Sequence, residues 1–266
     1  IFIGAKNDFS IKKFFEPEET ISVSSSEALQ ELPQVKGKNN YLFVITGKDE
    51  ETLYLTGIMQ TDMDSVSYKV CNLLPNTSLD GNALSAIYKN GGMNNLMQAV
   101  EKDLSIDIDY YIIMNLSDFE KFFDLLGSVN YPLIQDIKFK NSTGKDTYSL
   151  KLSAGEQILD GKKFTSLLRY YVNEKKDCKL ANDLVLNSLN QLINAENAEN
   201  KETLFKEFIV LSKTNFTVKD FSERTDNITV LADSRTGVNS YNVEITYKNG
   251  ALDSDSKSSV KSYFAK

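Results

Sequence analysis

Residues 108–127 read IDYYIIMNLSDFEKFFDLLG, and this stretch decides the fold class. Its first seven residues are a largely apolar run that predicts a buried strand. Ser117 and Glu120 have the spacing of a capping box, in which two side chains satisfy free backbone N–H groups at a helix start. The helix that follows has an apolar face made of Phe119, Phe122, Phe123 and Leu126. A strand followed at once by an amphipathic helix is typical of α/β proteins.

The chain on either side repeats this mixture of strands and helices. Apolar runs before it predict three closely spaced strands, as in an antiparallel meander, over 41–46, 52–60 and 66–74. Helical spacing of apolar residues predicts helices over 93–104, 161–171, 180–193 and 204–208. Thr217 and Asp220 predict the cap of a short helix, and two last strands are expected near 228–231 and 241–247. We therefore expect an α/β fold, a mixed β-sheet flanked by helices in an α-β-α sandwich.

The domain organisation follows from where this periodicity begins and ends. Residues 1–40 lack it and predict an extended, weakly packed lead-in of the kind that connects a membrane anchor to a domain. Residues 41–250 are expected to form one domain, and residues 251–266 a polar, frayed tail. Because the chain starts at Ile1, an N-terminal anchor or signal is expected to lie outside it.

The composition of the 266-residue chain excludes several kinds of chemistry. It has no histidine, which rules out Ser-His-Asp and Cys-His catalysis and histidine metal sites. A net charge of −7 without a basic stripe excludes nucleic acid as the expected partner. Two cysteines are too few for a disulfide framework or a four-cysteine zinc site. Of 30 basic residues only three are arginines, which leaves few planar clamps for phosphate: Arg169, Arg224 and Arg235.

Two ordered segments resemble a known family. Residues 81–93 read GNALSAIYKNGGM, and the strand and helix quoted above end in LLGSV. They resemble the LytR-CpsA-Psr family of cell-envelope proteins. That family has a G-x-x-x-L-x-x-A-Y-x-x-G-G segment, which is followed by I-D-Y-Y and then by a helix that ends in L-G-G-V. The matching residues are Leu84, Tyr88, Gly91, Gly92, 108–111, Phe119, Asp124, Leu126, Gly127 and Val129. Further likenesses at 152–161, 168–170, 214–217 and 220–221 extend the resemblance over about residues 41–232.

The resemblance implies a fold, a location and a chemistry. The family's domain is a mixed sheet flanked by helices, anchored in the membrane and facing outward from a Gram-positive-type bacterium. It binds a polyprenyl-pyrophosphate carrier in a hydrophobic pocket, and active members transfer the carried glycan with its phosphate onto peptidoglycan. Arginines hold the pyrophosphate and acidic residues hold magnesium, since phosphoryl transfer needs fixed cations around the phosphate oxygens.

Most of the family's arginine positions are changed in this chain. Where the family has P-R-D-T, this chain has Asn76 in place of the arginine. Where the family has R-S-D-T, the arginine is absent from 49–52, and Glu51 or Asp49 stands near the aspartate. Arg169 remains, and Asp177 matches an acid, but Leu180 and Asp183 stand at about the places of two helix arginines. A lysine in place of an arginine would fit the lysine-rich composition of the chain. Asparagine, leucine or aspartate in place of an arginine is not explained by that composition.

The candidate site residues follow from this matching. The residues expected to bind phosphate are Arg169, Asn76 and Lys179, with Lys175 and Lys176 nearby. The residues expected to hold magnesium, if the protein is active, are Glu51, Asp49 and Asp177. Cys71 and Cys178 flank the same segments, so a redox link is an alternative to two buried thiols.

Three functions remain open at this point. The first is a catalytically reduced domain on the extracytoplasmic face of the membrane that binds a polyprenyl-(pyro)phosphate-linked glycan precursor. The second is an active magnesium-dependent phosphotransferase or pyrophosphatase that attaches glycopolymers to peptidoglycan. The third is a cell-surface structural or interaction domain without a ligand pocket. Because the missing arginines fall where the resemblance needs its charge, we favour the first.

Overall fold

The computed structural model describes residues 31–141, 147–233 and 237–266. The chain divides into two compact units, Ile1–Leu32 and Pro33–Lys266, and the account below concerns the second. Most of the expected lead-in, residues 1–30, lies outside the described residues. The end of that lead-in already belongs to the domain, because the first strand begins at Lys38.

A six-stranded mixed sheet forms the centre of the domain, in the order β11-β6-β1-β2-β3-β12. Its strands are β1 (Lys38–Thr46), β2 (Leu53–Asp62), β3 (Ser67–Leu73), β6 (Tyr110–Asn115), β11 (Lys213–Thr214) and β12 (Asn239–Asn242). The first three strands form the antiparallel meander expected from their spacing. β6 pairs with β1 in parallel, and β12 pairs with β3 in parallel. The mixed sheet predicted from the sequence is therefore confirmed.

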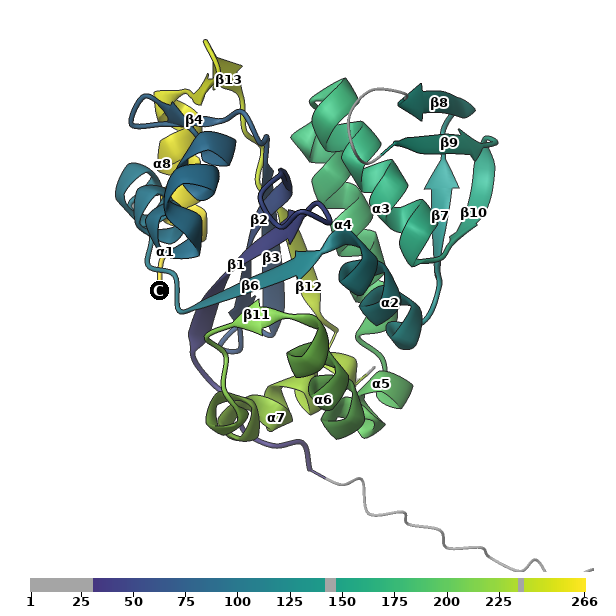
Figure 1. Cartoon of the computed structure of the whole chain (residues 1–266). Coiled ribbons are helices and arrows are strands. Elements are labelled where there is room, and N and C mark those ends of the chain that lie inside the picture. The colour runs from purple at the N-terminus through teal and green to yellow at the C-terminus, as the bar shows by residue number, and fades with distance from the viewer. Residues whose placement is uncertain (1–30, 142–146, 234–236) are drawn as a thin grey trace, which may run out of the picture. The chain divides into compact units, whose positions relative to one another are not determined.

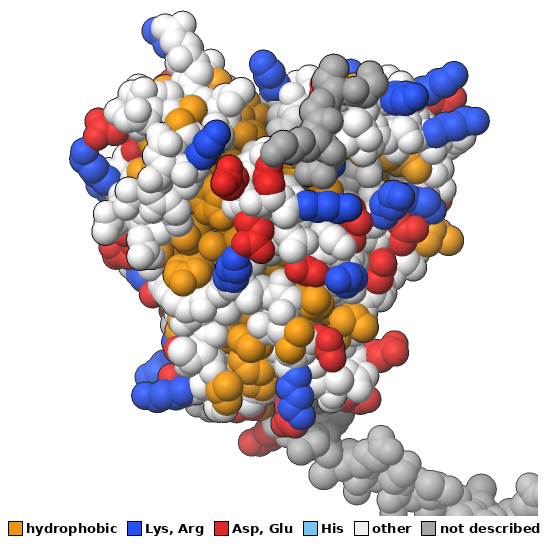
Figure 2. Space-filling view, viewed as in Figure 1, with side chains coloured by type: hydrophobic (Ala, Val, Ile, Leu, Met, Phe, Trp, Pro, Cys, Tyr) orange, Lys and Arg blue, Asp and Glu red, His pale blue; other side chains and the backbone are white. Residues whose placement is uncertain are grey.

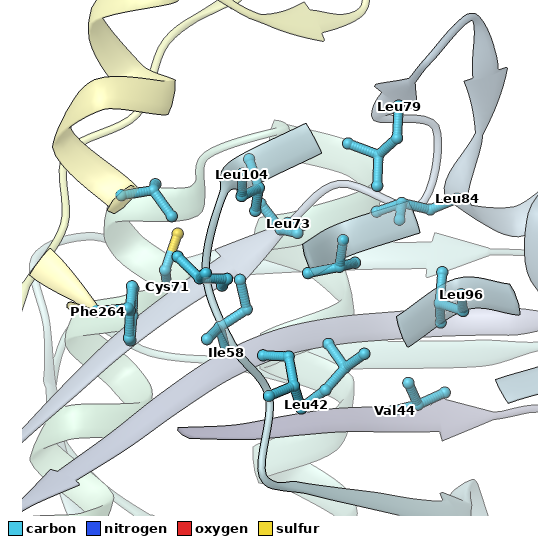
Figure 3. Packing of buried hydrophobic residues seen from close by; sticks show 14 of the residues in the cluster. Leu42, Val44, Ile58, Cys71, Leu73, Leu79, Leu84, Leu96, Leu104 and Phe264 are labelled. Atoms are coloured by element: carbon cyan, nitrogen blue, oxygen red, sulfur yellow. The ribbon is translucent and has the colours of Figure 1, made fainter. Parts of the chain in front are cut away.

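One face of the sheet is covered by two helices, α1 (Leu84–Leu104) and α8 (Ser254–Tyr263), which lie together in Figure 1. Leu42 and Val44 of β1 point into the cluster beneath them, where both are fully buried (Figure 3). The expected frayed tail is instead part of this face. In α8, Val260 is fully buried and the adjoining Phe264 is 1% exposed, because an amphipathic segment gains stability by burying its apolar side. We call this side of the sheet the closed face.

The other face is covered by helices from the middle of the chain (Figure 1). They are α2 (Leu116–Leu126), α3 (Gly161–Arg169), the π-helix η2 (Tyr170–Lys175) and α4 (Cys178–Leu192). Phe43 and Ile45, which alternate along β1 with the residues of the closed face, belong to the cluster on this side. The α-β-α sandwich is thus formed by the two faces of one set of strands.

Three further helices follow α4: α5 (Ala195–Glu199), α6 (Lys201–Leu211) and α7 (Val218–Ala232). The predicted strand at 228–231 is wrong, because these residues are the last turns of α7. The predicted start of helix α7 is confirmed, because Thr217 and Asp220 form a complete capping box. The expected capping box at Ser117 is wrong, because α2 starts earlier with Asn115 as its N-cap, whose side chain accepts from the Asp118 N–H at 3.0 Å.

The remaining strands form four two-stranded ladders outside the central sheet. They pair β4 (Ser78–Leu79) with β5 (Asn82–Ala83), β7 (Val129–Leu133) with β10 (Gly155–Leu159), β8 (Ile137–Asn141) with β9 (Tyr148–Leu152), and β13 (Tyr247–Lys248) with β14 (Ala251–Leu252). The predicted strand at 241–247 is therefore divided between β12 and β13. None of the described helices combines the length and the apolar character that a bilayer crossing requires.

Candidate functional site

Arg169 is the last residue of α3 and lies between two aromatic rings. Its guanidinium carbon is 4.2 Å from the ring centroid of Tyr54 and 4.3 Å from that of Tyr148. The residue is only 4% exposed. A planar guanidinium stacks well on aromatic faces, and removal from water strengthens the attraction. Strand β2, helix α3 and strand β9 therefore converge on the arginine that the sequence singled out.

Burial in this stack keeps the Tyr148 phenol neutral. Burial raises the pKa of Tyr148 to about 12, although the nearby Arg169 charge acts in the opposite direction. At neutral pH the tyrosine hydroxyl therefore keeps its proton. Arg169 is followed directly by η2, and π-helical turns often occur at functional sites. The chain then leaves η2 through Lys176, which has a left-handed backbone with φ of 53°.

The other two residues expected to bind phosphate lie on the surface. Asn76 is exposed in the turn that follows β3. Lys179 is exposed in the first turn of α4, and its Nζ forms an ion pair with Glu244 Oε1 at 2.9 Å. An exposed ion pair of this kind holds its lysine weakly, so a stronger anion could replace the glutamate. In this arrangement Arg169 is the candidate cation that is buried by the fold.

Two of the three acids expected to hold magnesium accept hydrogen bonds from nearby backbone N–H groups. Asp49 accepts from the N–H groups of Glu51 at 3.1 Å and of Thr52 at 2.9 Å, and from the Thr52 hydroxyl. Asp177 is the N-cap of α4 and accepts from the Leu180 N–H at 2.9 Å. Glu51 is exposed. These are local turn and cap contacts, which the same residue types make in many proteins.

Magnesium requires several converging oxygen ligands in near-octahedral geometry. Within residues 31–141, 147–233 and 237–266, no three acidic, cysteine or histidine side chains gather closely enough to hold a metal ion. The carboxylates of Asp49 and Asp177 are occupied by backbone donors. The residues present therefore do not fit a magnesium ion in this arrangement, and we derive no chemical step through one.

The two cysteines are free thiols. Cys71 lies on β3 within the hydrophobic cluster of the closed face, which also includes Leu73 and Phe264 (Figure 3). The Sγ of Cys178, the first residue of α4, is 3.8 Å from the Tyr247 hydroxyl. Burial raises the pKa of both thiols, that of Cys178 to about 11. Both are protonated at neutral pH and behave as small apolar side chains, as the alternative of two buried thiols predicted.

A buried amide network, which the sequence did not reveal, joins β3, α4 and β12. The Oδ1 atom of Asn182 accepts from the backbone N–H of Asn72 at 2.6 Å and from its side-chain amide at 2.8 Å. Asn182 donates in turn to Asn242 Oδ1 at 2.7 Å. Such a network fixes its members because each amide would be costly to bury alone. In the sequence, the only sign of this network is Asn72, which stands among the apolar residues of β3.

A cavity of about 280 Å³ lies between the sheet and the helices of the second face. Alternate residues of the strands point into it, among them Phe43 and Ile45 of β1 and Met114 of β6. Five phenylalanines form much of its wall: Phe119, Phe122, Phe123, Phe164 and Phe208. Asn72 and Ser188 are polar exceptions in a lining that is otherwise almost wholly apolar. We call this side of the sheet the cavity face. α3 connects it to the aromatic stack, because Leu168 lines the cavity and Arg169 follows it.

The comparisons with known proteins agree with this architecture. The model of the LytR_cpsA_psr family matches residues 60–263. The chain belongs to the LytR-CpsA-Psr family. That assignment, which the motifs predicted, covers Arg169, the helices that line the cavity and the closing helix α8. No curated protein matches the chain by sequence.

Solved structures share the LytR-CpsA-Psr fold. A candidate transcription regulator from Eubacterium siraeum is 19% identical, with a TM-score of 0.75 over 93% of this chain and 98% of that one. B. subtilis TagV is 18% identical, with a TM-score of 0.64 over 86% and 96% of the two chains. TagT, solved bound to LIIa-WTA, is 17% identical, with a TM-score of 0.61 over 89% and 92%. At these identities the likeness shows the fold alone.

Proposed function

We propose that this domain binds a polyprenyl-(pyro)phosphate-linked glycan precursor, with part of the prenyl chain in the cavity. The observation that carries the proposal is the apolar cavity of about 280 Å³, which is lined by phenylalanines and aliphatic side chains. Ligand pockets commonly have volumes of about 300–1,000 Å³, so this one suits a few isoprene units better than a long chain. The TagT structures bound to LIIa-WTA and LI-WTA support a lipid-linked glycan of the same class.

Arg169 is the residue we assign to the phosphate. It is positioned by α3, whose preceding residue Leu168 lines the cavity. A guanidinium presents five N–H donors in a rigid fork that matches phosphate oxygens. The stack between Tyr54 and Tyr148 leaves the side chain largely removed from water. Binding would then require the rings to part, or the phosphate to approach the edge of the guanidinium. Asn76 and Lys179 remain proposals as second contacts.

We propose further that transfer chemistry is reduced in this domain. Phosphoryl transfer depends on several fixed positive groups around the phosphate. Arg224 lies in α7, where it donates to Asn39 Oδ1 at 3.1 Å and pairs with Asp220, and Arg235 is outside the described residues. Among the arginines of the described residues, Arg169 is therefore the one that lies beside the cavity. The extracytoplasmic location, the membrane anchor and a peptidoglycan-linked role belong to the same proposal.

Lipid binding tests the proposal at the cavity wall. We expect the full chain to bind polyprenyl phosphate. The Val185→Phe substitution places a ring in the cavity from α4, so we expect it to weaken binding at least tenfold. Val185→Ala is the matched control, because it changes the same position but leaves the cavity open. Binding could be followed by native mass spectrometry in detergent. No binding by the wild-type chain, or equal weakening by both variants, would contradict the proposal.

Turnover separates the binding function from the enzymatic alternative. We expect no phosphate release from a prenyl pyrophosphate in the presence of magnesium, because the acids do not gather into a metal site. Magnesium-dependent release that is lost in Arg169→Ala would show instead that the domain is an active phosphotransferase or pyrophosphatase. The Ala variant must keep the thermal unfolding midpoint of a folded domain for this comparison to count.

A further inference from the structure

The β8–β9 hairpin presents a face made almost entirely of lysine. Ile137 and Phe139 of β8, and Leu150 of β9, point inward. The alternating outward positions are all exposed, and they are Lys138, Lys140, Ser149 and Lys151. Figure 2 shows basic side chains gathered over this part of the molecule at the upper right. The chain as a whole carries a net charge of −7, so the lysine face is a local exception.

The register of the hairpin makes this arrangement costly. Lys138 pairs directly with Lys151, and Lys140 pairs with Ser149. Like charges directly opposite each other destabilise a pair of strands. None of the three lysines forms an ion pair with a described acidic residue. Asp136, at the base of the hairpin, accepts from the Ala154 N–H at 2.8 Å. A bound polyanion would stabilise three exposed lysines that have no acidic partner among the described residues.

The same hairpin also covers the arginine of the cavity face. On its inner side Tyr148 of β9 stacks on Arg169, with 4.3 Å between the guanidinium carbon and the ring centroid. Phe139 of β8 contacts Tyr148, with 5.5 Å between their ring centroids. The lysine face and Arg169 are therefore separated by one layer of side chains. A chain of anionic groups that lies on the outer face can continue over the hairpin edge to the candidate phosphate site.

We propose that Lys138, Lys140 and Lys151 bind a polymer with repeated phosphate groups and hold it beside Arg169. This inference rests on the proposed function for its substrate, because it assigns the lysine face to the polymeric part of a lipid-linked glycan. A polymer fits this face better than a membrane does. Peripheral membrane surfaces combine basic residues with apolar side chains that insert, whereas the outward positions here carry none. The nearest exposed apolar side chain, Ile134, precedes the hairpin.

Polyphosphate provides the test, with the full chain as the protein. The variant combines Lys138→Gln, Lys140→Gln and Lys151→Gln. Its matched control combines Lys89→Gln, Lys206→Gln and Lys248→Gln, which are exposed lysines on α1, α6 and β13. Both variants lose three positive charges. Binding of a fluorescent inorganic polyphosphate is measured by anisotropy at several salt concentrations, and thermal unfolding confirms that both variants are folded.

We expect the hairpin variant to bind at least tenfold more weakly, while the control stays within twofold of the wild type. The slope of log affinity against log salt should fall by about 2 in the hairpin variant, since each contact with a single-stranded phosphate chain contributes about 0.7. Absent wild-type binding, or equal weakening in the control, would overturn the proposal. So would hairpin-dependent binding to phosphatidylglycerol vesicles without binding to polyphosphate, which would identify a membrane surface.

Lipid binding distinguishes this inference from the proposed function. The hairpin variant should keep the wild-type affinity for polyprenyl phosphate, because its substitutions lie outside the cavity wall. Hairpin-dependent polyphosphate binding in a protein that binds no polyprenyl phosphate would support the lysine face and overturn only the lipid in the cavity. The reverse result, lipid binding without polyphosphate binding, would overturn only the lysine face.

Discussion

The two faces of the central sheet are formed by the same strands but are packed differently. On the closed face, Leu42, Val44 and Leu73 are all fully buried beneath α1 and α8. On the cavity face, Phe43 and Ile45 of the same strand border about 280 Å³ of empty space. Protein interiors are normally packed as densely as organic crystals, so an apolar void of this size is the exception. The closed face provides stability, and the cavity face gives up part of its packing.

The helices explain why the faces differ. α1 and α8 contribute small and aliphatic side chains that interdigitate with the strands, such as Leu96, Val100 and Val260. The helices of the cavity face contribute large rings, which meet at offset or edge-on angles. Phe123 and Phe164, for example, have centroids 4.4 Å apart, and Phe122 and Phe208 5.7 Å. Aromatic side chains of these helices thus form much of the cavity wall.

Leucine truncation should give the largest difference between the faces. Leu73→Ala on the closed face should lower the free energy of unfolding by about 3–5 kcal/mol. Leu55→Ala on the cavity face should cost about 2–3 kcal/mol, because Leu55 borders space that already lacks partner atoms. Both leucines are almost fully buried, at 0% and 3% exposure. Urea unfolding measures the pair, and equal losses would mean that the cavity is closed in solution.

Adding volume should also destabilise the closed face more than the cavity face. Val100→Phe in the closed face has no space for the ring and should cost about 2–3 kcal/mol. Val185→Phe, from α4 into the cavity, should change the free energy of unfolding by less than about 1 kcal/mol. Thermal unfolding of the two variants at one pH is the measurement. A large cost in both would show that the cavity wall cannot accept a ring.

Exchange of the stacked arginine should have a moderate effect confined to the cavity face. Arg169→Lys keeps the charge but loses the planar group between Tyr54 and Tyr148, and should cost about 1–2 kcal/mol. Arg224→Lys on α7 is the control. Its guanidinium carbon lies farther from a ring, at 5.3 Å from the Tyr110 centroid, and the residue is partly exposed. Urea unfolding should show the larger loss for Arg169, and the reverse order would contradict the stack.

Acid should have the smallest effect. Hydrogen bonds from Thr217 and Tyr110 lower the pKa of Asp220 from its ordinary 3.8 to about 2. Because the folded pKa is the lower one, the stabilisation is complete above about pH 4 and is lost as the pH falls toward 2. Asp220→Asn should therefore flatten the fall of the thermal midpoint between these values. Asp253→Asn at α8, whose carboxyl pKa is also lowered, is the counterpart on the closed face. Identical pH profiles for wild type and Asp220→Asn would contradict this assignment.

Much of the fold could be predicted because the decisive signals are local. The apolar runs of the first three strands and the capping box at Thr217 are contained within a few residues, and the structure confirms them. The errors arose where a local pattern allows two outcomes. The run at 228–231 is short enough for a strand or a helix turn, and α7 includes it. Val260 of α8 and Phe264, the residue that caps it, are four residues apart, but serines and lysines around them obscured that spacing.

The site could be predicted only in part because its contacts are distant in sequence. The resemblance identified Arg169, and the structure shows it buried, but Tyr54 and Tyr148 come from other elements. Nothing near Arg169 in the sequence indicates that two rings cover it. The same applies to Asn182, whose partners Asn72 and Asn242 lie on strands far along the chain in both directions. Such networks depend on how the sheet is assembled.

The closing of the domain by α8 has a consequence for synthesis. The amide of Asn40, near the start of β1, donates to the backbone carbonyl of Phe264 at 3.0 Å in a fully buried contact. β12 likewise adds to the sheet beside β3, from which it is separated by most of the chain. Contacts between the two ends of a chain form late and slow the folding of the whole. In a nascent chain, α1 alone could cover Leu42, Val44 and Leu73, and the packing of this face would be completed only once α8 has left the ribosome.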